Sequence, residues 1–506
     1  MKTKIYIKNS LLAALGTLFL TACSLDYEPL STFSELNVGG TTSTGTTVKF
    51  RTKAEMKTQY DYMYNMLATN KLEAWGLDML VYADTRADNA YRGATDAELA
   101  QLEQQRPDGN NKNINRDWEQ LFGMIAATNS VIVNIDSVPD ATLTAAERKR
   151  WKAEALILRA MVYFDIVRLW GDVPLVIAEP PAINAQNIEE VYPLYFPKRD
   201  PVLTIYQQMV KDLNTALEPG GAPAISSNKF VLSRTVANAL LAKIYAEKPV
   251  RDYAKVVEYS TEVEKDVTLV PNYGDLFNMN SANTDLRNRN TSEAIFEITF
   301  AGGGNWLTWM CGIDLATSSS KYDWKKWFTP SRDLIAAFDR AGDTERKNQT
   351  IVRATVDWNL HYPSKDYPFM FKYRSKYHSV IKLRLADILL LKAEALVEQN
   401  NLAEAATIVN TIRKRAKLAN LPTDITSSKE KMADAVLNER RLELAFEGQR
   451  WFDLVRTGKV ISVMNTLNAR DPGRLPMKTL TEERLILPIP QAQIDKNPSM
   501  VQNPGY

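Results

Sequence analysis

The chain has 506 residues, of which 24% are charged and 45% hydrophobic, and this balance is ordinary for a soluble globular protein. A formal net charge of +2 argues against nucleic acid or an anionic membrane surface as the partner. Two cysteines exclude a disulfide framework. With two histidines and no zinc spacing, we expect no metal site and no cofactor, and no phosphate-binding loop or nucleophile elbow occurs.

The N-terminus has the features of an export signal. Lys2, Lys4 and Lys8 precede the apolar run Leu11 to Leu20, which is far shorter than the roughly 20 residues that a membrane-spanning helix needs. Leu20-Thr21-Ala22-Cys23 resembles the bacterial lipobox, so we expect cleavage before Cys23 and lipidation of its thiol. The alternative is an ordinary secreted protein whose Cys23 is unmodified.

The lipobox gives the first two expected segments. Residues 1–22 are a lipoprotein signal peptide, and residues 23–50 are a lipid-anchored tether. Asp26 and Glu28 in this tether resemble acidic signals for display on the cell surface, or they belong to a plain solvated linker.

The rest of the chain is predicted to be mainly α-helical. Apolar residues recur at helical spacing, with Gly171 ending a helix over 145–170, Pro201 starting one over 202–217, and Ser233 capping the next. The patterns give about four helix pairs, at 52–138, 144–218, 233–267 and 381–417. Small residues within these pairs favour stacking of the tetratricopeptide kind, and an unrelated helical bundle is the alternative.

Two long stretches do not follow this pattern. Residues 71–116 and 268–380 are rich in Trp, Tyr, Asn, Asp and turn formers, with short strand-like runs such as 294–300. Long irregular insertions on a regular scaffold usually carry function. We therefore expect a helical-repeat part at 51–270, an irregular binding subdomain with short strands at 271–380, and a C-terminal part with the last helix pair at 381–506.

Three motifs carry a family resemblance. WKAEALILRAMVYFDIVRLWGDVPLV (151–176), NERRLELAFEGQRWFDLVRTGK (438–459) and LILPIPQAQIDKNPSMVQNPGY (485–506) resemble the hallmarks of the SusD/RagB family of outer-membrane lipoproteins of Bacteroidota. The resemblance implies a tetratricopeptide-like fold and a place on the outer membrane, facing the cell exterior. It also implies nutrient uptake, with capture of oligosaccharides or peptides for a SusC-like TonB-dependent transporter.

The hallmark residues themselves have a structural interpretation. Trp118, Trp151, Trp170 and Trp451 are expected in the core. Arg159 and Arg168 are expected to pair with acids such as Glu443, Glu447 or Asp453. The spacings Arg440–Glu443, Glu447–Arg450 and Asp453–Arg456 also allow ion pairs along a helix. Cys311 is expected to be a small buried hydrophobic residue.

The ligand is expected at aromatic residues of the irregular stretches. An aromatic ring stacks on the apolar face of a sugar, and neighbouring amides or carboxylates bond its hydroxyls. Each of these tryptophans has packing of the subdomain as its alternative role. The candidates are Trp75, Tyr82, Asp84, Asn89 and Tyr91 in the first stretch, and Asn305, Trp306, Trp309, Tyr322, Trp324 and Trp327 in the second.

Several functions therefore remain open at this stage. A glycan-binding lipoprotein that serves a transporter is the first, and a peptide-capturing RagB-like lipoprotein is its variant. A surface glycoside hydrolase would need two positioned carboxylates, which no motif presents. A purely structural lipoprotein is the third class. We expect no catalytic residues, no metal and no nucleic-acid partner.

Overall fold

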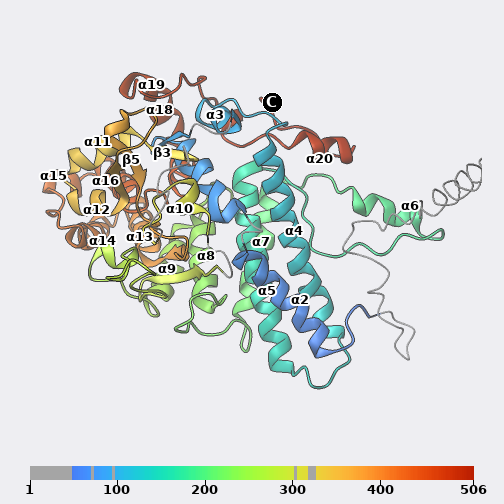
Figure 1. The fold of residues 1–506 in the computed structure, drawn as a ribbon. Helices are drawn as coiled ribbons and strands as arrows, with labels where there is room; N and C mark the ends of the chain where they lie inside the picture. Colours follow the sequence, from blue (N-terminus) through green and yellow to red (C-terminus); the bar gives the residue numbers. More distant parts are fainter. Residues whose placement is uncertain (1–47, 70–72, 94–96, 301–304, 317–325) are drawn as a thin grey trace, which may run out of the picture. The chain divides into compact units, whose positions relative to one another are not determined.

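Helix pairs form the body of the molecule in the computed structural model (Figure 1). The structure describes residues 48–69, 73–93, 97–300, 305–316 and 326–506. Thr52–Tyr506 form one compact unit. Among the described residues, no helix is long and apolar enough to cross a membrane.

The four predicted helix pairs are confirmed. They are α2 (Lys53–Ala68) with α4 (Lys112–Asn134), α5 (Ala145–Trp170) with α7 (Val202–Leu217), α8 (Arg234–Ala246) with α9 (Tyr253–Glu264), and α13 (Leu385–Glu398) with α14 (Leu402–Arg415). Each pair contacts the next: α4 packs on α5, α7 on α8, and α8 and α9 on α13. Fully buried alanines on α8 and α13 let these helices approach closely, as the sequence predicted.

Local signals fix the ends of these helices. Thr144 and Glu147 form a reciprocal capping box at the start of α5, and Gly171 ends that helix with a φ of 74°, which favours glycine. The Ser233 hydroxyl accepts a hydrogen bond from the Val236 N–H at the start of α8. Helix α5 therefore begins and ends, and α8 begins, at the predicted residues.

Further helices and helical turns fill the remaining segments. The α-helices among them are α3 (Ala97–Glu103), α6 (Ile188–Val191), α10 (Leu307–Met310), α11 (Arg332–Ala341), α12 (Thr344–Thr350), α15 (Thr423–Thr426), α16 (Lys429–Glu443), α17 (Arg450–Arg456), α18 (Val460–Asn465), α19 (Leu467–Arg470) and α20 (Gln491–Lys496). The π-helical turns are η2 (Ala74–Asp78) and η3 (Val81–Thr85). The 3-10 turns are η4 (Ile135–Ser137), η5 (Tyr192–Tyr195), η6 (Lys248–Val250), η7 (Tyr273–Leu276), η8 (Ser364–Asp366) and η9 (Glu482–Arg484).

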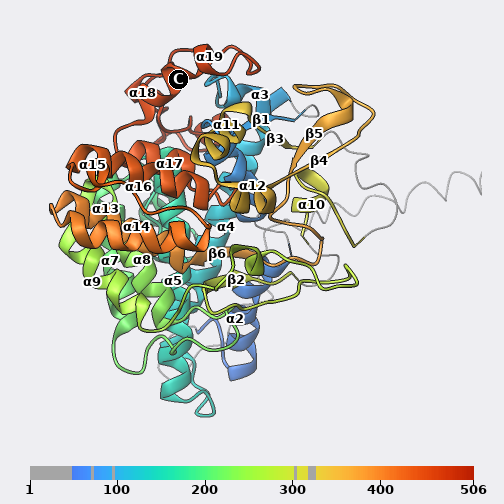
Figure 2. The ribbon, with the colours of Figure 1, turned by 90° about the vertical axis from the view of Figure 1, so that its left-hand side faces the viewer.

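The strands form antiparallel two-stranded sheets, of which β1–β3 and β2–β6 join the irregular region to other parts of the chain and β4–β5 is a hairpin within it. They are β1 (Ala90–Arg92) with β3 (Phe328–Pro330), β2 (Ala294–Ile298) with β6 (Val380–Arg384), and β4 (Ile351–Ala354) with β5 (Tyr367–Met370). The strand-like run at 294–300 is thus β2. Figure 2 shows the β4–β5 hairpin and α10 together on one side of the molecule.

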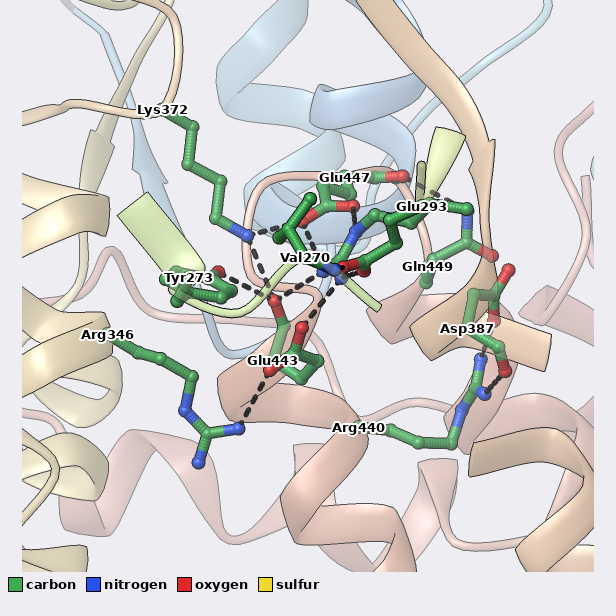
Figure 3. Close-up of polar contacts among 12 residues, drawn as sticks. Val270, Tyr273, Glu293, Arg346, Lys372, Asp387, Arg440, Glu443, Glu447 and Gln449 are labelled. Atoms are coloured by element: carbon green, nitrogen blue, oxygen red, sulfur yellow. Dashed lines mark hydrogen bonds and ion pairs between the residues drawn. The ribbon is translucent and has the colours of Figure 1, made fainter. Parts of the chain in front are cut away.

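The C-terminal hallmark forms a buried ion network around Glu443 (Figure 3). Its carboxylate accepts hydrogen bonds from Arg346 at 3.0 Å, Arg384 at 2.6 Å and Arg415 at 2.5 Å. These guanidinium groups hold the pKa of Glu443 well below its usual range, against the opposing effect of burial. The network ties α16 to α12, β6 and α14.

The predicted partners of the hallmark arginines are mostly wrong. Arg159 makes a bidentate ion pair with Asp212, both contacts at 2.7 Å, and Arg168 pairs with its neighbour Asp165. Of the three pairs expected along one helix, the structure contains Asp453–Arg456 at 2.7 Å. Glu443 and Glu447 pair instead with buried bases that lie far away in sequence, namely Arg346, Lys372, Arg384 and Arg415.

Candidate functional site

Three large aromatic side chains are exposed on the segment that contains α10 and on the segment that is hydrogen-bonded to it. Trp306 is 42% exposed, Trp309 50% and Tyr377 47%. We call these three residues the aromatic platform. Single exposed rings are ordinary on a protein surface, whereas several on adjoining segments can mark a binding surface.

Asn305 joins the two segments of the platform. Its backbone N–H donates to the Lys376 carbonyl at 2.7 Å, and its side-chain amide donates to the His378 carbonyl at 2.6 Å. Its side-chain oxygen accepts from the Leu307 N–H at 2.9 Å and so begins α10. Asn305 is 3% exposed, so it positions the platform from below and does not face solvent.

His378 lies beneath the platform as a neutral imidazole. Its Nδ1 accepts from the Arg374 N–H at 3.3 Å, so Nε2 carries the proton and donates to the Phe277 carbonyl at 3.1 Å. Burial, with the nearby Arg374 guanidinium, lowers the pKa of His378 to about 3. The imidazole is therefore a fixed structural support at neutral pH.

Charged groups lie on the platform segments or contact their backbone. Arg289 donates to the Tyr377 carbonyl at 2.6 Å and forms an ion pair with Asp285, and the Asp314 carboxylate accepts from the Ala316 N–H at 3.0 Å. Exposed aromatic faces on segments that also carry carboxylates and a guanidinium suit a ligand that has apolar C–H faces and hydroxyl groups at its rim. This is the chemistry of a sugar ring.

The structure places Trp327 inside the protein. It is 7% exposed, and its indole N–H donates to the Asp78 carboxylate at 3.2 Å. Lys326, also buried, donates to the Trp309 carbonyl at 3.0 Å and supports the end of α10. Trp327 therefore packs under the platform and does not extend it.

The candidates from the first stretch also lie inside the protein, against our expectation of a ligand surface. Tyr82 donates to Asp117 at 2.5 Å, Tyr91 donates to Asp471 at 2.7 Å, and Lys382 lies 4.5 Å from the centre of the Trp75 ring. All five candidates of this stretch are at most 5% exposed: Trp75, Tyr82, Asp84, Asn89 and Tyr91.

The remaining polar groups of that stretch bind the C-terminal hallmark. Asp84 accepts from the Asn89 amide at 2.8 Å and from the Phe446 N–H at 3.1 Å, and Asn89 accepts from Arg441 at 2.9 Å. Between them, Asp88 makes a bidentate ion pair with Arg450 at 2.8 and 2.9 Å. The stretch is an internal anchor, so it offers no surface to a ligand in this conformation.

Two further candidates and the lipidation residue lie outside the described residues. These are Tyr322, Trp324 and Cys23, and they remain predictions. Tyr377, in contrast, was missed by the sequence reasoning. Its signal was an aromatic residue inside the polar run RSKYHS of the same irregular region.

The predicted burial of the other aromatic and thiol residues is confirmed. Trp118, Trp151, Trp170, Trp451 and Cys311 are all buried. Within the part of the chain that the structure describes, no three His, Cys, Asp or Glu side chains gather in a way that could hold a metal ion.

Two family models match the chain. One, described as "SusD family", covers residues 371–506, and the other, described as "Starch-binding associating with outer membrane", covers residues 44–246. The SusD-like protein P2 of Formosa agariphila is 25% identical over 501 residues, which cover 90% of this chain and 93% of that protein. The starch-binding protein SusD of Bacteroides thetaiotaomicron is 25% identical over 451 residues, 72% of this chain and 74% of that protein.

A solved structure has the same fold. Surface glycan-binding protein A of Bacteroides thetaiotaomicron, in complex with laminarihexaose, superimposes with a TM-score of 0.70 at 19% identity. The match covers 89% of this chain and 99% of that protein. The expected fold, helical repeats with an irregular region that contains short strands, is confirmed.

Proposed function

This chain belongs to the SusD/RagB family of Bacteroidota, whose members associate with the outer membrane, and on that premise we propose that it captures oligosaccharides at the cell surface. We further propose that it delivers them to a SusC-like TonB-dependent transporter. The observation that carries the capture step is the aromatic platform, with two tryptophans and a tyrosine between 42% and 50% exposed and held from below by buried hydrogen bonds.

Calorimetry with defined neutral oligosaccharides tests the capture step. Laminarihexaose and maltohexaose are suitable probes, because similar proteins are named for laminari-oligosaccharide and starch binding. Trp306→Ala combined with Trp309→Ala should abolish measurable binding, whereas Tyr62→Ala, an equally exposed aromatic residue on α2, should leave it unchanged. Equal affinity in all three proteins, or binding of a peptide pool in place of every oligosaccharide, would overturn the proposal.

We propose that a lipid on Cys23 anchors the protein to the outer membrane, with the described unit facing the cell exterior. The lipobox Leu20-Thr21-Ala22-Cys23 supports this step. Palmitate labelling of the protein in cells should be lost in Cys23→Ala, and that protein should leave the membrane fraction. Continued labelling of the variant would contradict the anchor.

An exposed apolar segment supports the transporter as the partner. Residues 177–203 present several large hydrophobic side chains to solvent, and a concentration of this kind usually marks a protein or membrane contact. We call these residues the apolar arm, and Figure 1 shows its helix α6 standing away from α4 and α7. Its exposed members are Ile177, Ile183, Ile188, Tyr192, Leu194, Tyr195 and Leu203.

Charge substitutions on the apolar arm test delivery separately from capture. Ile188→Glu with Leu194→Glu should prevent co-purification with the co-expressed transporter and leave oligosaccharide affinity unchanged. Tyr62→Glu with Val133→Glu places the same two charges on exposed residues elsewhere and serves as the control. Co-purification that survives the arm variant but fails in the control would place the contact elsewhere.

We propose that capture involves no turnover. The platform is built from aromatic rings and backbone hydrogen bonds, and stacking requires no acid or base. Incubation of each oligosaccharide with purified protein should leave its chromatographic profile unchanged. Cleavage that is lost on changing one carboxylate would contradict this proposal.

A further inference from the structure

We propose a second binding site, for an anionic sugar, in a cavity between the loop that precedes α4 and the C-terminal segment. The cavity has a volume of about 820 Å³, within the range of about 300–1,000 Å³ typical of small-molecule sites. None of its lining residues belongs to the aromatic platform. The choice of a sugar rests on the proposed function, whereas the choice of an anion rests on the charges of the cavity.

Backbone hydrogen bonds between distant segments hold the walls. The Gln491 N–H donates to the Gly109 carbonyl at 2.7 Å, and the Lys478 N–H donates to the Gln104 carbonyl at 3.0 Å. A Cβ atom on Gly109 would lie 3.1 Å from the Ile489 carbonyl oxygen, so glycine permits this close approach. The cavity is therefore preformed, with no closing movement needed to build it.

Cations dominate the lining. The lining contains three cationic residues, Arg106, Lys478 and Arg484, and one acidic residue, Asp108. The Asp108 carboxylate is already hydrogen-bonded within the protein: it accepts from the Asn110 N–H at 2.8 Å and from the Gln101 amide at 3.2 Å. Among the described residues, none of the three cations forms an ion pair with a carboxylate, so their charge is available to a ligand.

The other lining groups suit a sugar ring. The Tyr506 ring lies 4.8 Å from the Arg484 guanidinium, and Arg484 is fixed by donation to the Gly505 carbonyl at 2.6 Å. Burial raises the pKa of Tyr506, so its hydroxyl stays a donor, here to the Ile486 carbonyl at 2.8 Å. One flat ring beside cations matches the C–H face and the acidic group of a uronate or a sulfated sugar, and it offers too little apolar surface for an acyl chain.

Removing two of the cations tests the site. Arg106 and Lys478 are exposed, and their side chains form no ion pair with a described residue, so Arg106→Gln with Lys478→Gln should leave the melting temperature unchanged. Arg340→Gln with Lys248→Gln removes one arginine and one lysine elsewhere and is the matched control. Calorimetry would compare oligogalacturonate, a sulfated oligosaccharide, inorganic sulfate and laminarihexaose.

We expect an acidic oligosaccharide to bind the native protein and to bind the cavity variant roughly tenfold more weakly, with weakening at high salt. The control variant should bind as the native protein does. Comparison of oligogalacturonate with the sulfated oligosaccharide identifies which acidic group is recognised. Equal affinity in the cavity variant and its control would overturn the inference, as would sulfate alone binding as tightly as either sugar.

The outcome is separable from that of the proposed function. Trp306→Ala with Trp309→Ala should weaken laminarihexaose and leave the acidic oligosaccharide unchanged, whereas the cavity variant should do the reverse. Loss of the first effect alone would remove the platform as the capture site, and loss of the second alone would remove the cavity site.

Discussion

Two regions of this molecule have a similar composition, but one is buried and the other is exposed. The 75–91 stretch and the aromatic platform with its support at 375–378 both combine large aromatic rings with amides and charged groups. In the first, the polar side chains bind oppositely charged or donor groups of the C-terminal hallmark, so the rings are buried. In the second, Asn305 bonds backbone carbonyls from below, so the rings remain outside. The number of aromatic residues in a segment therefore does not identify a binding surface. What decides whether the rings are exposed is where the hydrogen-bond partners of the neighbouring polar side chains lie.

The same substitution in the two regions should give the largest contrast. Trp75 is 5% exposed, so Trp75→Ala leaves a cavity and should lower the free energy of unfolding by about 3–5 kcal/mol. Trp306→Ala should change that free energy by less than about 0.5 kcal/mol, because its ring is on the surface. Urea unfolding followed by fluorescence measures both. A loss below about 1 kcal/mol for Trp75→Ala would show that the 75–91 stretch is not a packed anchor.

Lowering the pH should destabilise the protein through His378, the buried residue beneath the aromatic platform. The folded pKa of His378 is lowered to about 3, whereas the unfolded value is near 6.5, so the unfolded chain binds the extra proton between these values. Stability from this group is complete above pH 6.5 and falls by about 1.4 kcal/mol per pH unit below it, or about 2–3 kcal/mol at pH 4.5.

His378→Gln isolates that effect. Glutamine retains an N–H donor for the Phe277 carbonyl but has no proton to gain in this range. Urea unfolding from pH 7 to pH 4.5 should show a shallower loss of stability in the variant than in the native protein. Parallel pH dependences in the two proteins would mean that His378 already titrates normally in the fold.

Asn305 is predicted to combine the properties of the two regions. It is buried like the 75–91 stretch, yet it holds the platform, so Asn305→Ala leaves the His378 carbonyl without its donor. The cost should be about 1–3 kcal/mol in stability, and oligosaccharide affinity should fall because Trp306 loses its fixed position. Melting curves and calorimetry on one sample measure both effects. A loss of affinity with no loss of stability would instead make the amide a direct ligand contact.

Short-range signals made the helical part of this fold predictable. Gly171 and Ser233 act on their own helix ends, so the sequence pattern located those ends correctly. The ion partners were not predictable from spacing, because Arg346 lies 97 residues from Glu443, and Arg441 lies 352 residues from Asn89. The same long-range contacts bury the 75–91 stretch, and for that reason local sequence patterns did not indicate that its candidate residues lie inside the protein.

Tyr377 gives the smallest predicted effect and the sharpest comparison with the buried region. Its ring is 47% exposed and its backbone carbonyl is already bonded by Arg289, so Tyr377→Ala should leave the melting temperature unchanged. If the ring extends the surface that Trp306 begins, oligosaccharide affinity should fall about three- to tenfold, which corresponds to about 0.7–1.4 kcal/mol. Tyr91→Phe is the opposite case, because it removes only the hydroxyl that donates to Asp471, and it should cost stability with no change in affinity. Calorimetry and thermal melts of both variants decide between them: if Tyr377→Ala binds like the native protein, the platform is limited to its two tryptophans.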